Sequence, residues 1–225
     1  TRNKILDAFA VHQISPEDLS TRSKNSQIPG KRNALSSPTI LVCLPTWANP
    51  FYNDILEGIT DYLRQEHCHM IVTQEIPQRS TMFSFFNYCA SLQIAGIIIM
   101  YPLSEDILRQ LHSAYPVVQC SEYNPFYTKI PYVSIDDYAV SKAAIAHLIG
   151  AGCKKIAFFS SSYDYRYVQN RYRAYKEMLV GNGMAVRPEY VIQVSDFSYQ
   201  GIRTAAHHFF RLAEPADAIF ATSGK

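Results

Sequence analysis

The chain has 225 residues, 48% of them hydrophobic, which is enough for one or two domains with apolar cores. A formal net charge of only +2 at pH 7 argues against a general nucleic-acid-binding surface. No apolar run approaches the ~20 residues of a membrane span, and no basic-then-apolar leader is visible, so we expect a protein without a membrane anchor or a secretion signal.

The first 38 residues differ in composition from the rest. Residues 2–11 have a helical pattern of apolar side chains, and residues 13–38 are rich in Ser, Pro, Asn, Lys and Arg. This composition predicts a linker or a weakly ordered arm. Its modest basic excess is compatible with contacts to DNA phosphates, but ordinary linker solubility explains the charge more simply.

The stretch from Thr39 to His67 predicts the strand–loop–helix unit that repeats along the rest of the chain. Thr39–Pro45 is an unbroken apolar run of strand length, as in a parallel strand buried on both faces. Asn53–Gln65 places its apolar residues on one helical face. The aromatic-rich loop between them should lie at the carboxyl edge of a parallel sheet, where open α/β sheets bind ligands.

Strands and helices then alternate along the chain. Apolar runs predict strands over residues 69–74, 94–100, 116–120, 132–135, 155–159, 190–194 and 216–222. Helical periodicity predicts helices over residues 82–92, 105–115, 138–151 (closed by Gly152), 170–181 and 199–211. In the first of these helices we expect Phe83, Phe86 and Ala90 to be buried. Such alternation predicts parallel sheets with right-handed crossovers.

Two short strands in quick succession before Asp136 suggest a boundary between two similar lobes. We therefore predict a headpiece remnant and linker over residues 1–38, an N-terminal lobe over 39–136 and an incomplete C-terminal lobe over 137–225. A cleft between such lobes would collect the loops that follow the strands.

Cysteines and histidines do not suggest a metal, a cofactor or disulfides. The five cysteines are scattered, odd in number and mostly inside apolar segments, as expected for reduced thiols in a cytoplasmic protein. His207 and His208 would point about 100° apart on a helix and could not easily share a metal ion. We predict no cofactor and a cytoplasmic location.

Several short motifs recur in the order of a known family. They lie at Ile40–Pro45, Asn49–Tyr52, Gly58, Ile94–Ile97, Pro116, Asp136, His147–Leu148, Gly152, Lys155–Ile156, Arg171 and Ala218–Thr222. In this order they resemble the effector-binding core of the lactose/galactose repressor (LacI/GalR) family. The opening Thr1–Ala8 also resembles the last helix of that family's helix-turn-helix headpiece.

The resemblance implies an α/β fold of two Rossmann-like lobes of the periplasmic-binding-protein-like type. It implies a bacterial transcription regulator that forms homodimers, binds a sugar or sugar phosphate between its lobes and couples that binding to operator DNA. The recognition helix is absent, so we expect a chain with most of the headpiece missing. The sequence also stops at Lys225, where the family continues through more strands and helices, so we expect a truncated C-terminus. Gly224 stands where relatives usually have a ligand-binding aspartate.

In the N-terminal lobe the resemblance points to four ligand-binding candidates. Phe51 or Tyr52 could stack on a sugar ring or a base, or could simply pack the loop against the helix. Tyr101 ends a strand, where it is either a ligand contact or a turn residue before a proline. Glu122 could accept hydrogen bonds from ligand hydroxyls or pair with an arginine. Trp47 lies in the first loop, either at the rim of the cleft or packed in a lid.

It points to five more, of which Asp136 ends the N-terminal lobe and the other four lie in the C-terminal lobe. Arg171 could hold hydroxyls, a carboxylate or a phosphate in a fixed fork, or could be a surface arginine paired with an acid such as Glu177. Asp136 could contact ligand, cap the following helix, or do both. The remaining candidates are Tyr165 and Tyr167, which could also form a plain aromatic rim, and Phe197, which could also be core packing.

Two other functional classes compete with this interpretation. A transporter-type solute-binding protein would share the two-lobed fold, but the headpiece-like start and the missing leader count against it. A nucleotide-dependent enzyme would need a glycine-rich phosphate loop, and no Gly-x-Gly-x-x-Gly occurs. No nucleophile–base pair is legible either, so we predict that the chain is not an enzyme.

Overall fold

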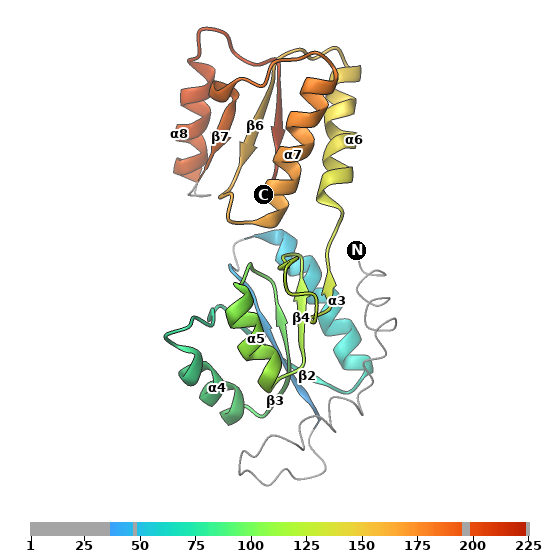
Figure 1. Cartoon of the computed structure of the whole chain (residues 1–225), viewed down its shortest axis with the longest axis vertical. Coiled ribbons are helices and arrows are strands. Elements are labelled where there is room, and N and C mark those ends of the chain that lie inside the picture. Colours follow the sequence, from blue (N-terminus) through green and yellow to red (C-terminus); the bar gives the residue numbers. More distant parts are fainter. Residues whose placement is uncertain (1–36, 47–48, 195–198, 224–225) are drawn as a thin grey trace. The chain divides into compact units, whose positions relative to one another are not determined.

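The structure is a computed structural model that describes residues 37–46, 49–194 and 199–223. The predictions made for residues 2–11, Trp47, Phe197 and Gly224 therefore lie outside the described residues. Contacts divide the chain into two compact units, with the division between Ile135 and Asp136. Each unit is an α/β structure built on its own parallel sheet (Figure 1).

The first unit contains five parallel strands in the order β2-β1-β3-β4-β5. Its elements are β1 (Thr39–Cys43), α3 (Pro50–Gln65), β2 (His69–Thr73), α4 (Met82–Ser91), β3 (Ile94–Ile99), α5 (Glu105–Ala114), β4 (Val117–Cys120) and β5 (Tyr132–Val133). The alternation of strands and helices predicted from the sequence is confirmed here.

Strand β1 is buried on both faces, which explains its unbroken apolar sequence. Leu41 and Cys43 pack in the cluster formed with α4 and α5. Ile40, Val42 and Leu44 pack in the cluster formed with α3. Because successive side chains of a strand point to opposite faces, a strand covered by helices on both sides has no polar positions.

The buried face of α4 differs from the predicted one by one position. Met82, Phe85 and Cys89 are the buried residues. Phe83, which we expected in the core, is 77% exposed, so that prediction is wrong. Seven of the ten residues from Met82 to Ser91 are hydrophobic, so their periodicity alone cannot choose a face, and packing against the sheet decides it.

Helix α3 begins three residues before the predicted Asn53. Its N-cap is Asn49, whose side-chain Oδ1 accepts a hydrogen bond from the backbone N–H of Phe51 at 3.1 Å. Pro50 occupies the first helical turn, where its missing N–H costs no helical hydrogen bond. Phe51 and Tyr52 consequently belong to the first turn of the helix rather than to the loop.

The second unit contains three parallel strands in the order β7-β6-β8. Its elements are α6 (Asp137–Gly150), β6 (Ile156–Ser160), α7 (Arg166–Gly181), the short 3-10 helix η1 (Pro188–Tyr190), β7 (Val191–Gln193), α8 (Tyr199–Phe210) and β8 (Ala218–Ala221). Helices α6 and α7 lie side by side (Figure 1). Gly152 has φ of +91° just after α6, as the helix-end prediction requires.

The central strand β6 again separates two layers of core. Ile156 and Phe158 pack with α6 and α7, whereas Ala157 packs with Tyr190 and Phe209. Helix α7 begins at Arg166, four residues earlier than predicted. The earlier start places Tyr167 in the first turn of the helix.

The described part of the chain contains neither a helix that could span a membrane nor a cluster of metal-binding side chains. None of its helices combines the length and apolarity needed to cross a lipid bilayer. No group of three or more His, Cys, Asp or Glu side chains is arranged to hold a metal ion there. The five cysteines are free thiols, and burial raises the pKa of Cys43 and Cys120 to about 12.

Candidate functional site

The carboxyl end of β1 and β3 is the ligand-binding edge expected for the first unit. From β1 the chain leads to β2 on one side, while β3 lies on the other side of β1. In open α/β sheets the crevice beside such a switch in strand order is where ligands bind. The loop after β1 leads directly into α3 and its aromatic first turn.

Of the two aromatic candidates in that turn, only one presents its ring to solvent. Phe51 is 39% exposed, whereas Tyr52 is 7% exposed and packs in the core beside Ile55. Their ring centroids are 5.5 Å apart in an edge-to-face arrangement. This geometry favours Phe51 as the stacking surface and favours the packing alternative for Tyr52.

Tyr101 and Glu122 are both buried at the ends of their strands. The Tyr101 hydroxyl donates a hydrogen bond to the carbonyl oxygen of Glu75 at 3.3 Å, and burial raises the pKa of that hydroxyl. Glu122 follows Ser121, a residue with φ of +70°, and its side chain is buried. Neither side chain offers a surface that a ligand could reach without rearrangement of its neighbours.

In the second unit, Asp136 caps helix α6 as the structural alternative predicted. Its Oδ1 accepts a hydrogen bond from the backbone N–H of Ala139 at 2.9 Å. The residue is nevertheless exposed, so the capping role leaves it open to solvent.

The two tyrosine candidates at the start of α7 adopt different roles. Tyr165 is the N-cap residue of the helix, and its ring lies 5.6 Å from that of Tyr167. The hydroxyls of Tyr167 and Ser161 are hydrogen-bonded to each other at 2.5 Å. The ring of Tyr167 also lies 5.1 Å from the guanidinium carbon of Arg171.

Arg171 is the centre of the most elaborate polar cluster in the described chain. Its Nε and Nη2 both donate to Oδ1 of Asp137, at 2.8 and 2.6 Å. Its Nη1 donates to the carbonyl oxygen of Thr222, directly after β8. One side chain thereby links α7, the start of α6 and the carboxyl end of the sheet.

This ion pair is largely removed from water. The Asp137 side chain is 5% exposed and that of Arg171 is 21% exposed. Burial raises the pKa of the Asp137 carboxyl, and the hydrogen bond and charge of Arg171 lower it by less, so the pKa stays raised. A fork held in this way can offer its remaining N–H groups in a fixed geometry.

Buried hydroxyls lie around the same pair. The register that sets Phe158 beside Phe220 continues to Ser160 beside Thr222, so their side chains share the sheet face that packs against α6 and α7. Asp137 and Ser141 share the buried face of α6. The side-chain oxygens of Ser141, Ser160 and Thr222 have no hydrogen-bond partner among the described residues.

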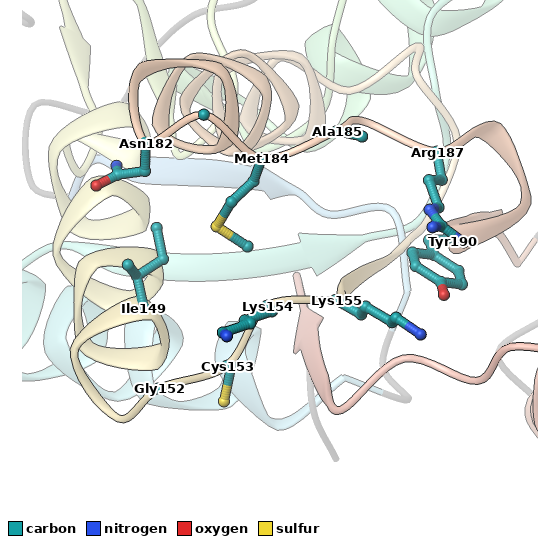
Figure 2. A pocket seen from close by; sticks show the side chains of 11 residues that line it. Ile149, Gly152, Cys153, Lys154, Lys155, Asn182, Met184, Ala185, Arg187 and Tyr190 are labelled. Carbon is teal, nitrogen blue, oxygen red and sulfur yellow. The ribbon is translucent and has the colours of Figure 1, made fainter.

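A hollow lies at the opposite end of the second unit, beside the amino end of β6. Its volume is about 530 Å³, and Met184 points into it between Ile149 and Tyr190 (Figure 2). Two of the three cations that line it are engaged, because Lys155 and Arg187 both bind Glu214, at 3.2 and 2.8 Å. The third cation in the lining is Lys154.

The backbone at this hollow is engaged as well. Asp217 accepts hydrogen bonds from the backbone N–H groups of Lys154 and Lys155, at 2.8 and 2.9 Å. These backbone donors and two of the three lining cations are thus already paired within the unit, which weakens the hollow as an anion site.

Comparison with known proteins identifies the family to which the chain belongs. Residues 37–225 match the family described as periplasmic binding proteins and the sugar binding domain of the LacI family. The chain belongs to this family. The LacI/GalR resemblance and the two-sheet α/β fold expected from the sequence are thereby confirmed.

Among curated LacI-family relatives, the HTH-type transcriptional repressor CytR of Escherichia coli is 24% identical over 227 aligned residues. The match covers 99% of this chain and 63% of the repressor. The chain thus spans less than two thirds of the length of that relative.

Solved LacI-family structures share the fold. A putative LacI transcriptional regulator from Bacillus cereus subsp. cytotoxis is 24% identical with a TM-score of 0.73, covering 84% of this chain and 69% of that one. Cra from Pseudomonas putida, solved with fructose 1-phosphate, is 20% identical (TM-score 0.69; 84% and 70% covered). A Lactobacillus casei regulator with bound glucose is 17% identical (TM-score 0.70; 82% and 70% covered).

Sequence reasoning singled out Arg171 in this LacI-family domain but missed its partners. Its alternative to ligand binding was a pairing with Glu177 or another acid. The acid is Asp137, and the Glu177 carboxylate is instead hydrogen-bonded to the hydroxyl of Tyr138. Asp137 stands next to the predicted Asp136, and the double acid before a helix was the available signal. Thr222 contributes its backbone carbonyl oxygen, and because every residue has one, the residue type could not indicate this contact.

Proposed function

We propose that this chain is the effector-binding core of a DNA-binding transcription regulator and that its effector is a small, sugar-like molecule bound between the two lobes. The observation that supports this most is the Arg171–Asp137–Thr222 cluster, a fixed polar fork at the carboxyl edge of a parallel sheet. The sugars in two solved structures of the family support the class of ligand.

In this proposal each lobe contributes a different kind of contact. Arg171 supplies hydrogen bonds to hydroxyls, with Tyr165 and Tyr167 at its side. Phe51 supplies an aromatic face for the apolar side of a sugar ring. Asp136, Glu122, Tyr101, Tyr52 and Phe197 remain proposed second-rank contacts.

The direct test is a binding screen with the purified chain. Sugars, sugar phosphates and nucleosides are added singly, and the thermal unfolding midpoint and the fluorescence of Trp47, the single tryptophan, are recorded. We expect at least one compound to raise the midpoint, because a ligand that binds only the folded state stabilises it. A screen in which no compound changes either signal would refute the proposal.

The regulatory part of the proposal needs the full reading frame. We propose that the complete protein is a cytoplasmic homodimer that binds operator DNA through a headpiece upstream of this core. The alternative is a solute-binding protein of a transporter. Fluorescence anisotropy of the full-length product on promoter DNA, with and without the effector, separates the two, because only the regulator would bind DNA and respond to the effector.

A further inference from the structure

The charge of Arg171 is already balanced inside the second unit. Both donors on one side of its fork bind Asp137, whose side chain is 5% exposed. A third donor binds the carbonyl oxygen of Thr222. A guanidinium has five N–H donors, so two remain for a ligand, on a group whose charge is matched by a neighbouring carboxylate.

The other cations of α6 and α7 are also engaged. Lys142 and Arg173 lie over the ring of Tyr138, at 5.4 and 4.5 Å from its centroid. Arg166, the first residue of α7, is not without a partner either. The exposed carboxylate of Asp136 adds negative charge beside the pair. The carboxylates of Asp136 and Asp137 thus both lie beside Arg171, where an incoming phosphate would meet them.

What the cluster offers in abundance is neutral hydrogen bonding. The hydroxyls of Ser141, Ser160 and Thr222 are buried and without a partner among the described residues. A buried hydroxyl left unpaired is costly, and each one can both donate and accept. Each of these hydroxyls could pair with a water molecule, or with a ligand hydroxyl if their neighbours rearrange, because such groups also both donate and accept.

We infer that the effector is an uncharged polyhydroxyl molecule rather than a phosphorylated or carboxylated one. The inference rests on the proposed function. A phosphate placed against Arg171 would also face the Asp137 carboxylate a few ångströms away, and in a poorly hydrated site that repulsion cancels the attraction of the guanidinium. A neutral hydroxyl can accept from Arg171 and donate to Asp137 without this penalty.

Matched pairs of compounds test the inference. Glucose and glucose 6-phosphate, ribose and ribose 5-phosphate, and adenosine and adenosine 5′-monophosphate are titrated into the chain by calorimetry. We expect any pair that binds to favour its uncharged member by about tenfold or more. A phosphorylated member that binds as tightly as its neutral partner overturns the inference but leaves the proposed function standing. Binding by no member of any pair counts against both.

A charge-neutralising variant localises the effect. Asp137→Asn keeps the shape of the side chain and leaves Arg171 with an unbalanced charge. The preference for the neutral member should then fall by about tenfold, because the variant attracts phosphate that the native pair repels. Glu177→Gln is the matched control. It removes a carboxylate of α7 that is hydrogen-bonded to Tyr138, the residue next to Asp137, and should leave the preference unchanged. An unchanged preference in folded Asp137→Asn would contradict the inference.

Discussion

The two ends of the small sheet in the second unit contain the same chemistry in different surroundings. At the carboxyl end Arg171 binds Asp137, whose side chain is 5% exposed. At the amino end Lys155 and Arg187 bind Glu214, whose side chain is 58% exposed. Both clusters tie separate elements together through a carboxylate. Their difference in burial determines what each can do for stability and for ligands.

The pKa values of the two carboxyl groups are shifted in opposite directions. Burial raises the pKa of Asp137 despite its arginine. Hydrogen bonds from Arg187 and Lys155 lower the pKa of Glu214, because water still solvates the charge. An exposed pair is worth little free energy, whereas breaking a buried pair leaves a charge without compensation. The comparison therefore predicts unequal responses to matched substitutions.

The largest effect is expected from Arg171→Ala. It leaves Asp137 buried without a counter-ion, and we expect the free energy of unfolding at pH 7 to fall by about 2–4 kcal/mol. Urea unfolding followed by circular dichroism measures the loss. The deficit should shrink as the pH is lowered, because a raised pKa lets the Asp137 carboxyl take up a proton and lose its uncompensated charge.

Arg173→Ala is the control for that substitution, since Arg173 is an exposed arginine of the same helix that lies over the ring of Tyr138. If Arg171→Ala lowers the free energy of unfolding no more than Arg173→Ala does, the buried Arg171–Asp137 pair does not matter more for stability than an exposed arginine, and the comparison fails.

A smaller effect is expected from the tyrosine that supports each end. Tyr175 is fully buried and donates a hydrogen bond from its hydroxyl to the carbonyl oxygen of Ile156 at 2.8 Å. Tyr190 is also buried and donates likewise to the carbonyl oxygen of Glu214 at 2.8 Å, but this hydrogen bond is only part-buried because Glu214 is exposed. We expect Tyr175→Phe to cost about 1–2 kcal/mol and Tyr190→Phe about half as much. Chemical denaturation of both variants in one buffer makes the comparison, and the reverse order would contradict it.

The smallest effect is expected from Glu214→Gln. Its change in unfolding midpoint should be minor at low ionic strength and should disappear in 1 M salt, where exposed charges are screened. Because the folded-state pKa of Glu214 is lowered, its stabilisation is present above about pH 4.3 and is lost as the pH falls through the folded-state value. A deficit that persists in acid or in high salt would show that Glu214 acts through packing instead.

Much of the secondary structure followed from local pattern. Strand β3, from Ile94 to Ile99, was predicted to within one residue because a run of apolar residues in an α/β chain has few other uses. Helix starts were less predictable. Asn49 and Tyr165 cap α3 and α7 several residues before the apolar periodicity becomes visible. An N-cap residue lies before the first helical turn, so it comes earlier in the sequence than the apolar residues from which the helix is recognised.

The sequence by itself determined the family, the alternation that builds two parallel sheets, and Arg171 as the residue to examine. These are properties of residue order and spacing, which a linear pattern records. Tertiary structure alone decided that Phe51 rather than Tyr52 is the exposed ring, that Met82 rather than Phe83 is buried in α4, and that Asp137 and the Thr222 carbonyl hold Arg171. Those choices depend on which face packs and which distant atoms meet, and neither is encoded in spacing along the chain.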